Sequence, residues 1–282
     1  MYNGVINPNF FTNYLVTIMT IVQSIIISII EGITEFIPIS STGHMIITEK
    51  LLNIPVDDFV EVFTIAIQLG AILSVVVLYW KRFIDFTKWQ FYLKLIVGVI
   101  PALILGFLLS NQIDKLLKSS LTVAITMLAG GIILLFIDKL FVRQTVKTDV
   151  QITYRSAFII GLWQCIAMIP GFSRSAASII GGMQQKLTRS LAAEFSFFLA
   201  VPTMMAATGY KLLKYIKQNG AFTSEQIKLL AIGNLVAFVV AILAIKFFIT
   251  YLKKHGLKIW GIYRVIVGLL LLILILTGYI NQ

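Results

Sequence analysis

The sequence has few charged residues and almost no cysteine. Charged side chains make up 12% of its 282 residues, whereas about 25% is typical of soluble domains. Apolar residues make up 59%, and the mean hydropathy is +0.94. This shortage of charge excludes an ordinary soluble domain. The single cysteine, Cys165, excludes an internal disulfide, and its apolar neighbours predict a packed thiol.

Basic residues are absent from the N-terminal part of the chain, because none occurs before Lys50. A secretory signal peptide begins with a basic segment, so we expect the first apolar segment to stay in the mature protein. Elsewhere the basic residues gather between apolar runs, as they do in the cytoplasmic loops of membrane proteins. The net charge of +11 therefore does not predict nucleic-acid binding.

Long apolar segments recur along the whole chain, as they do in multi-pass helical membrane proteins. A helix needs about 20 apolar residues to cross a bilayer. The segments fall at about 14–36, 41–52, 60–80, 91–110, 119–141, 154–169, 173–184, 188–210, 226–250 and 259–280. The segments 41–52 and 173–184 are too short to span at about 1.5 Å per residue. Each follows a proline and a polar turn, so we expect an all-α protein with two re-entrant helical hairpins and about six transmembrane helices.

The two predicted hairpins resemble each other in sequence. Pro170 lies 132 positions after Pro38. The same shift pairs Ser24 with Ser156, Ser41 with Ser173, Phe63 with Phe195 and Thr64 with Ser196. Each hairpin is followed by three crossings, which reverse the second copy relative to the first. We therefore predict a single membrane domain, 1–282, built as an inverted-topology repeat with copies at about 14–141 and 154–280.

Loop charge predicts the orientation of this topology. One side would hold Lys81, Arg82, Lys88, Lys94, Lys139, Arg143, Lys147, Arg155, Lys186, Arg189, Lys253, Lys254, Lys258 and Arg264. The other side would hold half as many: Lys50, Lys115, Lys118, Lys211, Lys214, Lys217 and Lys228. The positive-inside rule places the richer side in the cytoplasm. Both termini would then lie outside, and the hairpins would enter from opposite faces.

The first predicted hairpin tip, EGITEFIPISSTGH at residues 31–44, brings two acids toward the membrane interior. Glu31 and Glu35 are four apart, so they share one face of a helix. Ionised carboxylates at membrane depth are unfavourable unless they are paired or hydrated. The pair would suit Mg²⁺ or Ca²⁺, which prefer carboxylate oxygens. It would also suit a base and its partner, or a hydrated position at the interface.

Pro38 ends the first helix of this hairpin, because its ring cannot continue the hydrogen-bond ladder. Ser40, Ser41 and Thr42 follow, and hydroxyl residues favour the N-cap position. The second helix then begins near Ser41, with His44 one turn along on the same face. The N-terminus of a helix offers unpaired N–H groups to an anion. Taken alone, Ser-Ser-Thr-Gly is most often an ordinary cap.

The second tip, PGFSRSAAS at residues 170–178, repeats this design and adds an arginine. Ser173 is placed to cap the returning helix. Arg174 at membrane depth needs an anion, and its planar fork matches phosphate oxygens. The alternative is a structural ion pair with Glu31 or Glu35. Together the two tips specify a site for an anion plus a cation, which a metal-bound phosphate or diphosphate fits.

At these tips the sequence resembles the bacterial undecaprenyl-diphosphate phosphatases of the bacitracin-resistance type. The resemblance rests on EGITEFIPISSTGH and PGFSRSAASIIGGM, and is supported by FTIAIQLGAILSVVV, AEFSFFLAVPTMMAAT and IYRVIVG. It implies hydrolysis of a polyprenyl diphosphate to the monophosphate carrier used in cell-wall synthesis, with resistance to bacitracin. It further implies a multi-pass protein of the plasma membrane, a site open to the outer face, and dependence on a divalent cation. A homodimer is compatible with the sequence.

The resemblance also assigns roles to residues of both tips. It implies that Glu31 and Glu35 are the acidic pair, which would hold the metal, and that Arg174 binds phosphate. Ser41 matches the family's proposed nucleophile, and it would either attack the phosphorus or position the water that does. His44 would transfer a proton, in keeping with the pKa of imidazole.

The flanking hydroxyls Ser40, Thr42, Ser173 and Ser175 would bind substrate together with the arginine. The family has Gly after SRS where this chain has Ala176, which adds a methyl group where the backbone would approach the substrate.

Two rival functions remain open at this point. A transporter or a flippase of a phosphorylated lipid also shows inverted repeats, broken helices and intramembrane charge, and fold alone does not separate it from an enzyme. A carrier needs binding groups, however, and has no use for a nucleophile such as Ser41 beside a proton-transfer group such as His44. A structural scaffold would leave Arg174 and Glu31 unexplained.

Overall fold

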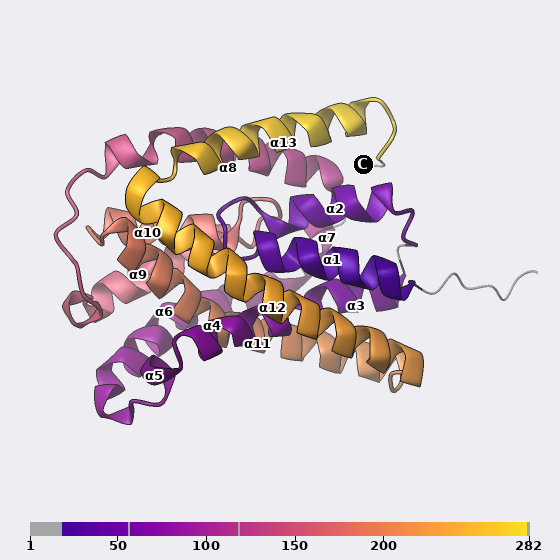
Figure 1. Cartoon of the computed structure of the whole chain (residues 1–282), viewed down its shortest axis with the longest axis horizontal. Helices are drawn as coiled ribbons and strands as arrows, with labels where there is room; N and C mark the ends of the chain where they lie inside the picture. Colours follow the sequence, from indigo (N-terminus) through magenta and orange to yellow (C-terminus); the bar gives the residue numbers. More distant parts are fainter. Residues whose placement is uncertain (1–18, 56, 118, 281–282) are drawn as a thin grey trace, which may run out of the picture.

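The computed structural model describes residues 19–55, 57–117 and 119–280, which form a bundle of α-helices (Figure 1). Six helical stretches in this part of the chain are long and apolar enough to cross a membrane: Asp58–Leu78, Trp89–Leu108, Ser120–Leu140, Arg189–Asn219, Ser224–His255 and Lys258–Leu276. The prediction of an all-α multi-pass protein with about six spanning helices is confirmed.

The first half of the chain contains the following helices: α1 (Ile21–Thr34), α2 (Ser41–Leu51), α3 (Asp58–Ala66), α4 (Gln68–Leu78), α5 (Trp80–Phe83), η3 (Phe86–Lys88), α6 (Trp89–Leu108), α7 (Ser110–Leu117) and α8 (Ser120–Leu140). The second half contains η4 (Asp149–Gln151), α9 (Tyr154–Ile166), α10 (Arg174–Gln184), α11 (Arg189–Asn219), α12 (Ser224–His255) and α13 (Lys258–Leu276).

Most of these bounds agree with the predicted segments, and hydroxyl caps explain several helix starts. Thr20, Thr153 and Thr223 each accept a hydrogen bond from a backbone N–H in the first turn of the helix that follows. The predicted segment 60–80 is divided into α3 and α4 at Ile67. Helix α11 runs well past the predicted end at 210, and residues 14–18 of the first predicted segment lie outside the described residues.

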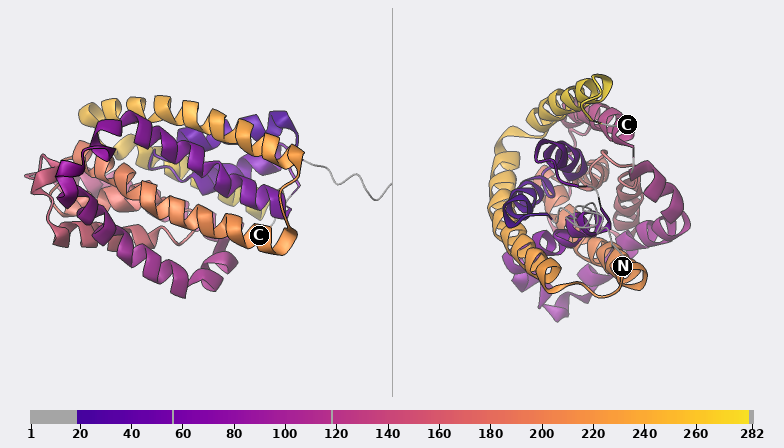
Figure 2. Two further views of the ribbon diagram at one scale, coloured as in Figure 1. Left: turned by 90° about the horizontal axis from the view of Figure 1, so that it is seen from below. Right: turned by 90° about the vertical axis from the view of Figure 1, so that its right-hand side faces the viewer.

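Two helical hairpins approach each other from opposite ends of the bundle (Figure 1). We call α1 and α2 the first hairpin, with its tip loop at 35–40, and α9 and α10 the second hairpin, with its tip loop at 167–173. The tips meet in the middle, where the Ser175 hydroxyl donates to the Phe36 carbonyl at 2.7 Å. Residues Ser175 to Met183 of α10 are all buried. Helices α12 and α13 form an outer arc around the hairpins (Figure 2).

Helix pairing is consistent with two related halves. Helix α1 packs against α12, and α9 packs against α6, while α8 and α13 pack against each other. If α1 corresponds to α9, α6 to α12 and α8 to α13, the α1–α12 contact of one half corresponds to the α9–α6 contact of the other. The α8–α13 contact corresponds to itself. The inverted repeat and the entry of the hairpins into a bilayer stay predictions.

The repeat register differs by one residue at the tips. Helix α2 begins at Ser41 after Ser40, and α10 begins at Arg174 after Ser173. Ser40 therefore corresponds to Ser173, and Ser41 to Arg174, because the second tip loop contains one more residue after its proline. The pairing of Ser41 with Ser173 is wrong at the level of helix position.

The loop-charge count is wrong at Arg264. This residue does not lie in a basic loop at the end of the bundle; it is 0% exposed within α13. Its guanidinium is held by backbone carbonyls, as described below, so it contributes nothing to the charge of either membrane surface.

Candidate active site

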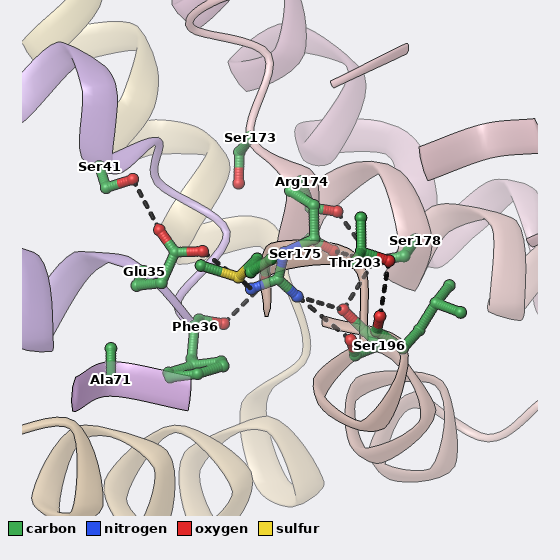
Figure 3. Close-up of polar contacts among 12 residues, drawn as sticks. Glu35, Phe36, Ser41, Ala71, Ser173, Arg174, Ser175, Ser178, Ser196 and Thr203 are labelled. Atoms are coloured by element: carbon green, nitrogen blue, oxygen red, sulfur yellow. Dashed lines mark hydrogen bonds and ion pairs between the residues drawn. The ribbon is translucent and has the colours of Figure 1, made fainter. Parts of the chain in front are cut away.

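Glu35 stands at the centre of the polar site, where it joins the two hairpins. Its Oε2 accepts a hydrogen bond from the Ser41 hydroxyl at 2.9 Å, and its Oε1 is ion-paired with Nη2 of Arg174 at 2.9 Å. Both contacts appear in Figure 3. Glu35 follows the last turn of α1, while Ser41 and Arg174 are the first residues of α2 and α10. The structure therefore brings together a hydroxyl, a carboxylate and an arginine from two distant parts of the chain.

Arg174 is fixed in place by several groups besides Glu35. Its Nη1 donates to the Ser196 carbonyl of α11 at 3.1 Å, and its guanidinium carbon lies 5.6 Å from the centre of the Phe36 ring. Cation–π contact of this kind favours a fixed guanidinium. The alternative that Arg174 pairs with a glutamate is thus realised with Glu35. The Nε atom of Arg174 is buried and has no hydrogen-bond partner.

The serines of the second hairpin form hydrogen bonds around Arg174. Ser175 binds the Phe36 carbonyl, as noted above, and Ser178 shares a 2.6 Å hydrogen bond with the Ser196 hydroxyl. Ser173 caps α10 by accepting from the Ala176 N–H at 3.2 Å. These contacts show that the hydroxyls of Ser175 and Ser178 join helices to one another. The hydroxyl of Ser173 caps its own helix.

Strained backbone marks the residue just before each helix start. Ser40 has φ 71° and Ser173 has φ 75°, in the region that side-chain-bearing residues rarely adopt. Such conformations are unfavourable by about 1–3 kcal/mol and gather at functional sites. Each strained serine lies directly before a helix, so the N-terminal N–H groups of α2 and α10 lie at the tips of the two hairpins. Two helix N-termini and Arg174 together form a site suited to an anion.

His44 does not contact Ser41, although both lie on the first turns of α2. Its Nδ1 is 2.7 Å from the Ser40 carbonyl, and its Nε2 is 2.8 Å from the hydroxyl of Tyr263 on α13. A carbonyl can only accept, so Nδ1 carries a proton, and in the neutral ring Nε2 then accepts from the Tyr263 hydroxyl. Thr42 is half-buried on the same turn. The proton acceptor that touches Ser41 is Glu35.

Glu31 lies one turn before Glu35 and is 1% exposed. Its Oε1 has no hydrogen-bond partner, and the same holds for the buried Ser40 Oγ. Buried polar atoms are almost always hydrogen-bonded, so each exception calls for a ligand or a water. The burial of both acids rules out a pair that is merely hydrated at the surface of the protein.

These residues fit a divalent cation in part. Carboxylate oxygen is the ligand that Mg²⁺ and Ca²⁺ prefer, and Glu31 offers a buried oxygen that nothing else binds. Glu35 uses both of its oxygens for Ser41 and Arg174. The described residues contain no cluster of three or more His, Cys, Asp or Glu side chains that would hold a metal by themselves. A cation at this site would thus need further oxygen ligands from water or a bound anion.

Two functional contacts escaped the sequence analysis. Arg264 and Tyr263 of α13 contact the tip loops and His44, respectively. A signal was present, because an arginine inside the apolar segment 259–280 is unfavourable in lipid and marks an interior position. Counting it as a loop charge concealed that signal.

Fold and site together define a class: a multi-pass helical membrane protein whose interior holds a serine, two carboxylates and an arginine at the junction of two helical hairpins. The model of the family described as bacitracin resistance protein BacA matches residues 24–270. The chain belongs to this family, as the motifs of the two tips indicated.

Curated relatives cover almost the whole chain. The undecaprenyl-diphosphatase of Flavobacterium psychrophilum is 58% identical over 256 residues, which cover 91% of this chain and 96% of that protein. The undecaprenyl-diphosphatase of Porphyromonas gingivalis is 49% identical over 278 residues, covering 92% and 98%. That of Aquifex aeolicus is 47% identical over 254 residues, covering 89% and 97%.

Proposed function

We propose that the protein hydrolyses undecaprenyl diphosphate to undecaprenyl phosphate and inorganic phosphate, and so returns the lipid carrier to cell-wall synthesis. Its family and the names of its curated relatives support this reaction. The observation in the structure that carries it is the chain of contacts from Ser41 through Glu35 to Arg174. These three contacting side chains combine a nucleophile, a base and a phosphate-binding cation.

In this mechanism the diphosphate lies between the two tips. The Ser41 oxygen attacks the terminal phosphorus and its proton passes to Glu35, which already accepts the hydrogen bond. The bond from that phosphorus to the bridging oxygen breaks, and the lipid monophosphate leaves. Water then hydrolyses the phosphoserine, releases inorganic phosphate and restores the hydroxyl. Arg174 and the N-termini of α2 and α10 stabilise the charge on the phosphoryl oxygens throughout.

His44 has a different place in this mechanism from the one that the motif suggested. Both of its ring nitrogens are engaged, by the Ser40 carbonyl and the Tyr263 hydroxyl. In this arrangement it holds the backbone beside Ser41. Transfer of a proton by His44 would require one of its ring nitrogens to leave its partner, either Nε2 from Tyr263 or Nδ1 from the Ser40 carbonyl.

A divalent cation, Mg²⁺ or Ca²⁺, would be held by Glu31 and by Glu35. Its contribution would be to neutralise the charge of the diphosphate and to orient its oxygens. The unpartnered Glu31 oxygen supports this proposal. The protein side chains supply the other functions: Arg174 orients the terminal phosphate, and Glu35 takes the proton of Ser41.

The family resemblance implies a site that opens to the outer face of the plasma membrane, and the two-to-one distribution of basic residues supports an orientation with both termini outside. Without Arg264 the bias is only slightly smaller. Tagging each terminus and testing its access to a protease in right-side-out vesicles measures this directly. Protection of both tags until the vesicles are lysed would contradict the proposed orientation.

A transporter or flippase would use the same binding groups, but it has no need for a serine hydroxyl bound to a carboxylate. Phosphate release from a C55 polyprenyl diphosphate, measured with purified protein in detergent, separates the two functions. We expect release by the wild type, its loss in chelator, and its recovery when Mg²⁺ or Ca²⁺ is added. Ser41→Ala should be inactive, while Ser224→Ala, on the exposed start of α12, should match the wild type. Full activity of Ser41→Ala would remove Ser41 from the reaction.

A further inference from the structure

Arg264 holds both tip loops from one side chain of α13. Its three nitrogens donate only to backbone carbonyls, which belong to both tips and to α8. These carbonyls are Pro38 at 3.3 Å, Phe172 at 2.8 Å, Gly171 at 2.9 Å, Thr126 at 3.3 Å and Met127 at 3.3 Å. No acid appears among these partners, and Arg264 is 0% exposed.

This contact satisfies two requirements at once. Helices α1 and α9 end at Thr34 and Ile166, and the carbonyls of the tip loops that follow them need other partners in a membrane interior. A buried guanidinium is equally unfavourable unless every N–H is used. Arginine alone has five donors in a planar fork, whereas lysine has three on a single nitrogen. The geometry therefore fixes the distance between the two loops through one residue.

The preceding residue, Tyr263, acts on the same loop by another route. Its hydroxyl donates to Nε2 of His44 at 2.8 Å, and the two rings lie parallel with centres 5.6 Å apart. His44 in turn donates from Nδ1 to the Ser40 carbonyl. Two adjacent residues of α13 thus hold the turn at the strained Ser40. Arg264 binds the carbonyl of Pro38, two residues before Ser40, and Tyr263 binds His44, which in turn binds the Ser40 carbonyl.

We propose that Tyr263 and Arg264 are positioning residues, which hold the strained Ser40 turn and keep Ser41 and Glu35 in register with Arg174. The kinetic tests of this proposal rest on the phosphatase activity proposed above. Loss of either contact lets the first tip relax away from the second. A misplacement of about 1 Å in a catalytic geometry lowers turnover by about 10²-fold.

The role of Tyr263 is tested by a double-mutant cycle with His44. Tyr263→Phe keeps the ring and loses the hydroxyl, so we expect kcat to fall about tenfold with KM little changed. In a His44→Ala background the same change should lower kcat less than about twofold, because the hydroxyl no longer has its partner. Tyr210→Phe, on an exposed part of α11, is the matched control and should match the wild type. An equal effect of Tyr263→Phe in both backgrounds would overturn this half of the proposal.

The role of Arg264 is tested without removing it. A methyl group on Gly130 of α8 would lie 2.8 Å from the guanidinium carbon of Arg264, so Gly130→Ala must displace that group. Gly268→Ala is the matched control, since its methyl group would meet Leu128 at 3.0 Å at the same α8–α13 contact. We expect kcat to fall about tenfold more in Gly130→Ala than in Gly268→Ala at comparable thermal stability. Equal losses of kcat in the two variants would mean that helix packing alone accounts for them.

A direct substitution completes the test. Arg264→Lys keeps the charge with fewer donors, and we expect kcat to fall about 10²-fold while KM changes much less. Arg189→Lys is its control, because that residue pairs with Asp138 and touches neither tip loop. A proportional rise of KM with unchanged kcat in Arg264→Lys would contradict a positioning role.

Hydrogen exchange gives a readout that does not depend on activity. In Arg264→Lys, amide exchange should rise at residues 38–44 and 171–175 together, and in Arg189→Lys it should stay as in the wild type at both loops. If the wild type releases no phosphate, the proposed function fails, while this exchange pattern still decides whether Arg264 holds the loops. Unchanged exchange at both loops in Arg264→Lys would overturn the proposal.

Discussion

Glu31 combines burial, a carboxyl group and an unused acceptor, so we expect its replacement by Gln to have opposite effects on stability and activity. The side chain is 1% exposed, its Oε1 has no hydrogen-bond partner, and Glu35 lies one turn away. Gln has nearly the same shape, cannot ionise beside Glu35 and brings an N–H that can donate to Glu35. In chelator, Glu31→Gln should therefore be more stable than the wild type.

The size of this effect follows from the burial of the atom. An unsatisfied buried polar group is unfavourable by about 1–3 kcal/mol, and each kcal/mol shifts Tm by about 2–4 °C in a domain of this size. We expect Tm to rise by about 2–12 °C in chelator. A saturating cation reverses the order, because binding at about 100 times Kd stabilises the wild type by about 2.7 kcal/mol. Without the Glu31 carboxylate most of that gain should be lost, together with activity.

The assay is a thermal scan of both proteins in one detergent at one scan rate, with chelator and then with a series of Mg²⁺ and Ca²⁺ concentrations. Glu225→Gln is the control, since its exposed carboxylate should change the free energy of unfolding by less than about 0.5 kcal/mol. A lower Tm for Glu31→Gln than for the wild type in chelator would refute the reasoning, because the carboxylate would then have partners that the structure does not show. An equal gain from cation in both proteins would separate Glu31 from metal binding.

Three further predictions concern the tips. Arg174→Ala should lower kcat by about 10³-fold or more, with partial recovery in Arg174→Lys, because a point charge replaces the planar fork; phosphate release measures both, and wild-type rates in the alanine variant would exclude this role. Ser41 should carry acid-stable label after rapid quench with substrate labelled in the terminal phosphate, and absence of label would favour direct attack by water. Gly171→Ala should destabilise the protein by about 1–3 kcal/mol, because φ is 89° and the methyl group would lie 2.8 Å from Val123 Cα. Gly209→Ala is the control: it has open space around it within α11, so it should keep or raise Tm in the same scan. Similar Tm values for the two variants would contradict the strain.

The helices themselves were predictable because their signals are local. Apolar segments long enough to cross a bilayer gave the spanning helices, and Pro38 and Pro170 marked where the hairpins turn. The acids, hydroxyls and arginine of the tips stood out because polar groups are unfavourable in an apolar surrounding. The family followed from the motifs of the two tips, EGITEFIPISSTGH and PGFSRSAASIIGGM.

The contacts between the tips were not predictable in the same way, because they join residues far apart in the chain. Periodicity places Ser41 and His44 on one face of a helix, yet in the structure Ser41 binds Glu35 while His44 binds Ser40 and Tyr263. His44 and Tyr263 are separated by 219 positions, and no local pattern relates them.

Arg264 shows most clearly which features the sequence can predict and which depend on the tertiary structure. From the sequence it is a basic residue near the start of an apolar segment, which fits a membrane surface as well as an interior. Only the packing of α13 against α8 brings its guanidinium to the carbonyls of Pro38 and Phe172, which lie in the two tip loops outside any helix. The amino-acid pattern determined which groups need partners in the membrane interior; the folded chain determined which groups meet, because partner choice depends on distances between helices that a linear pattern does not contain.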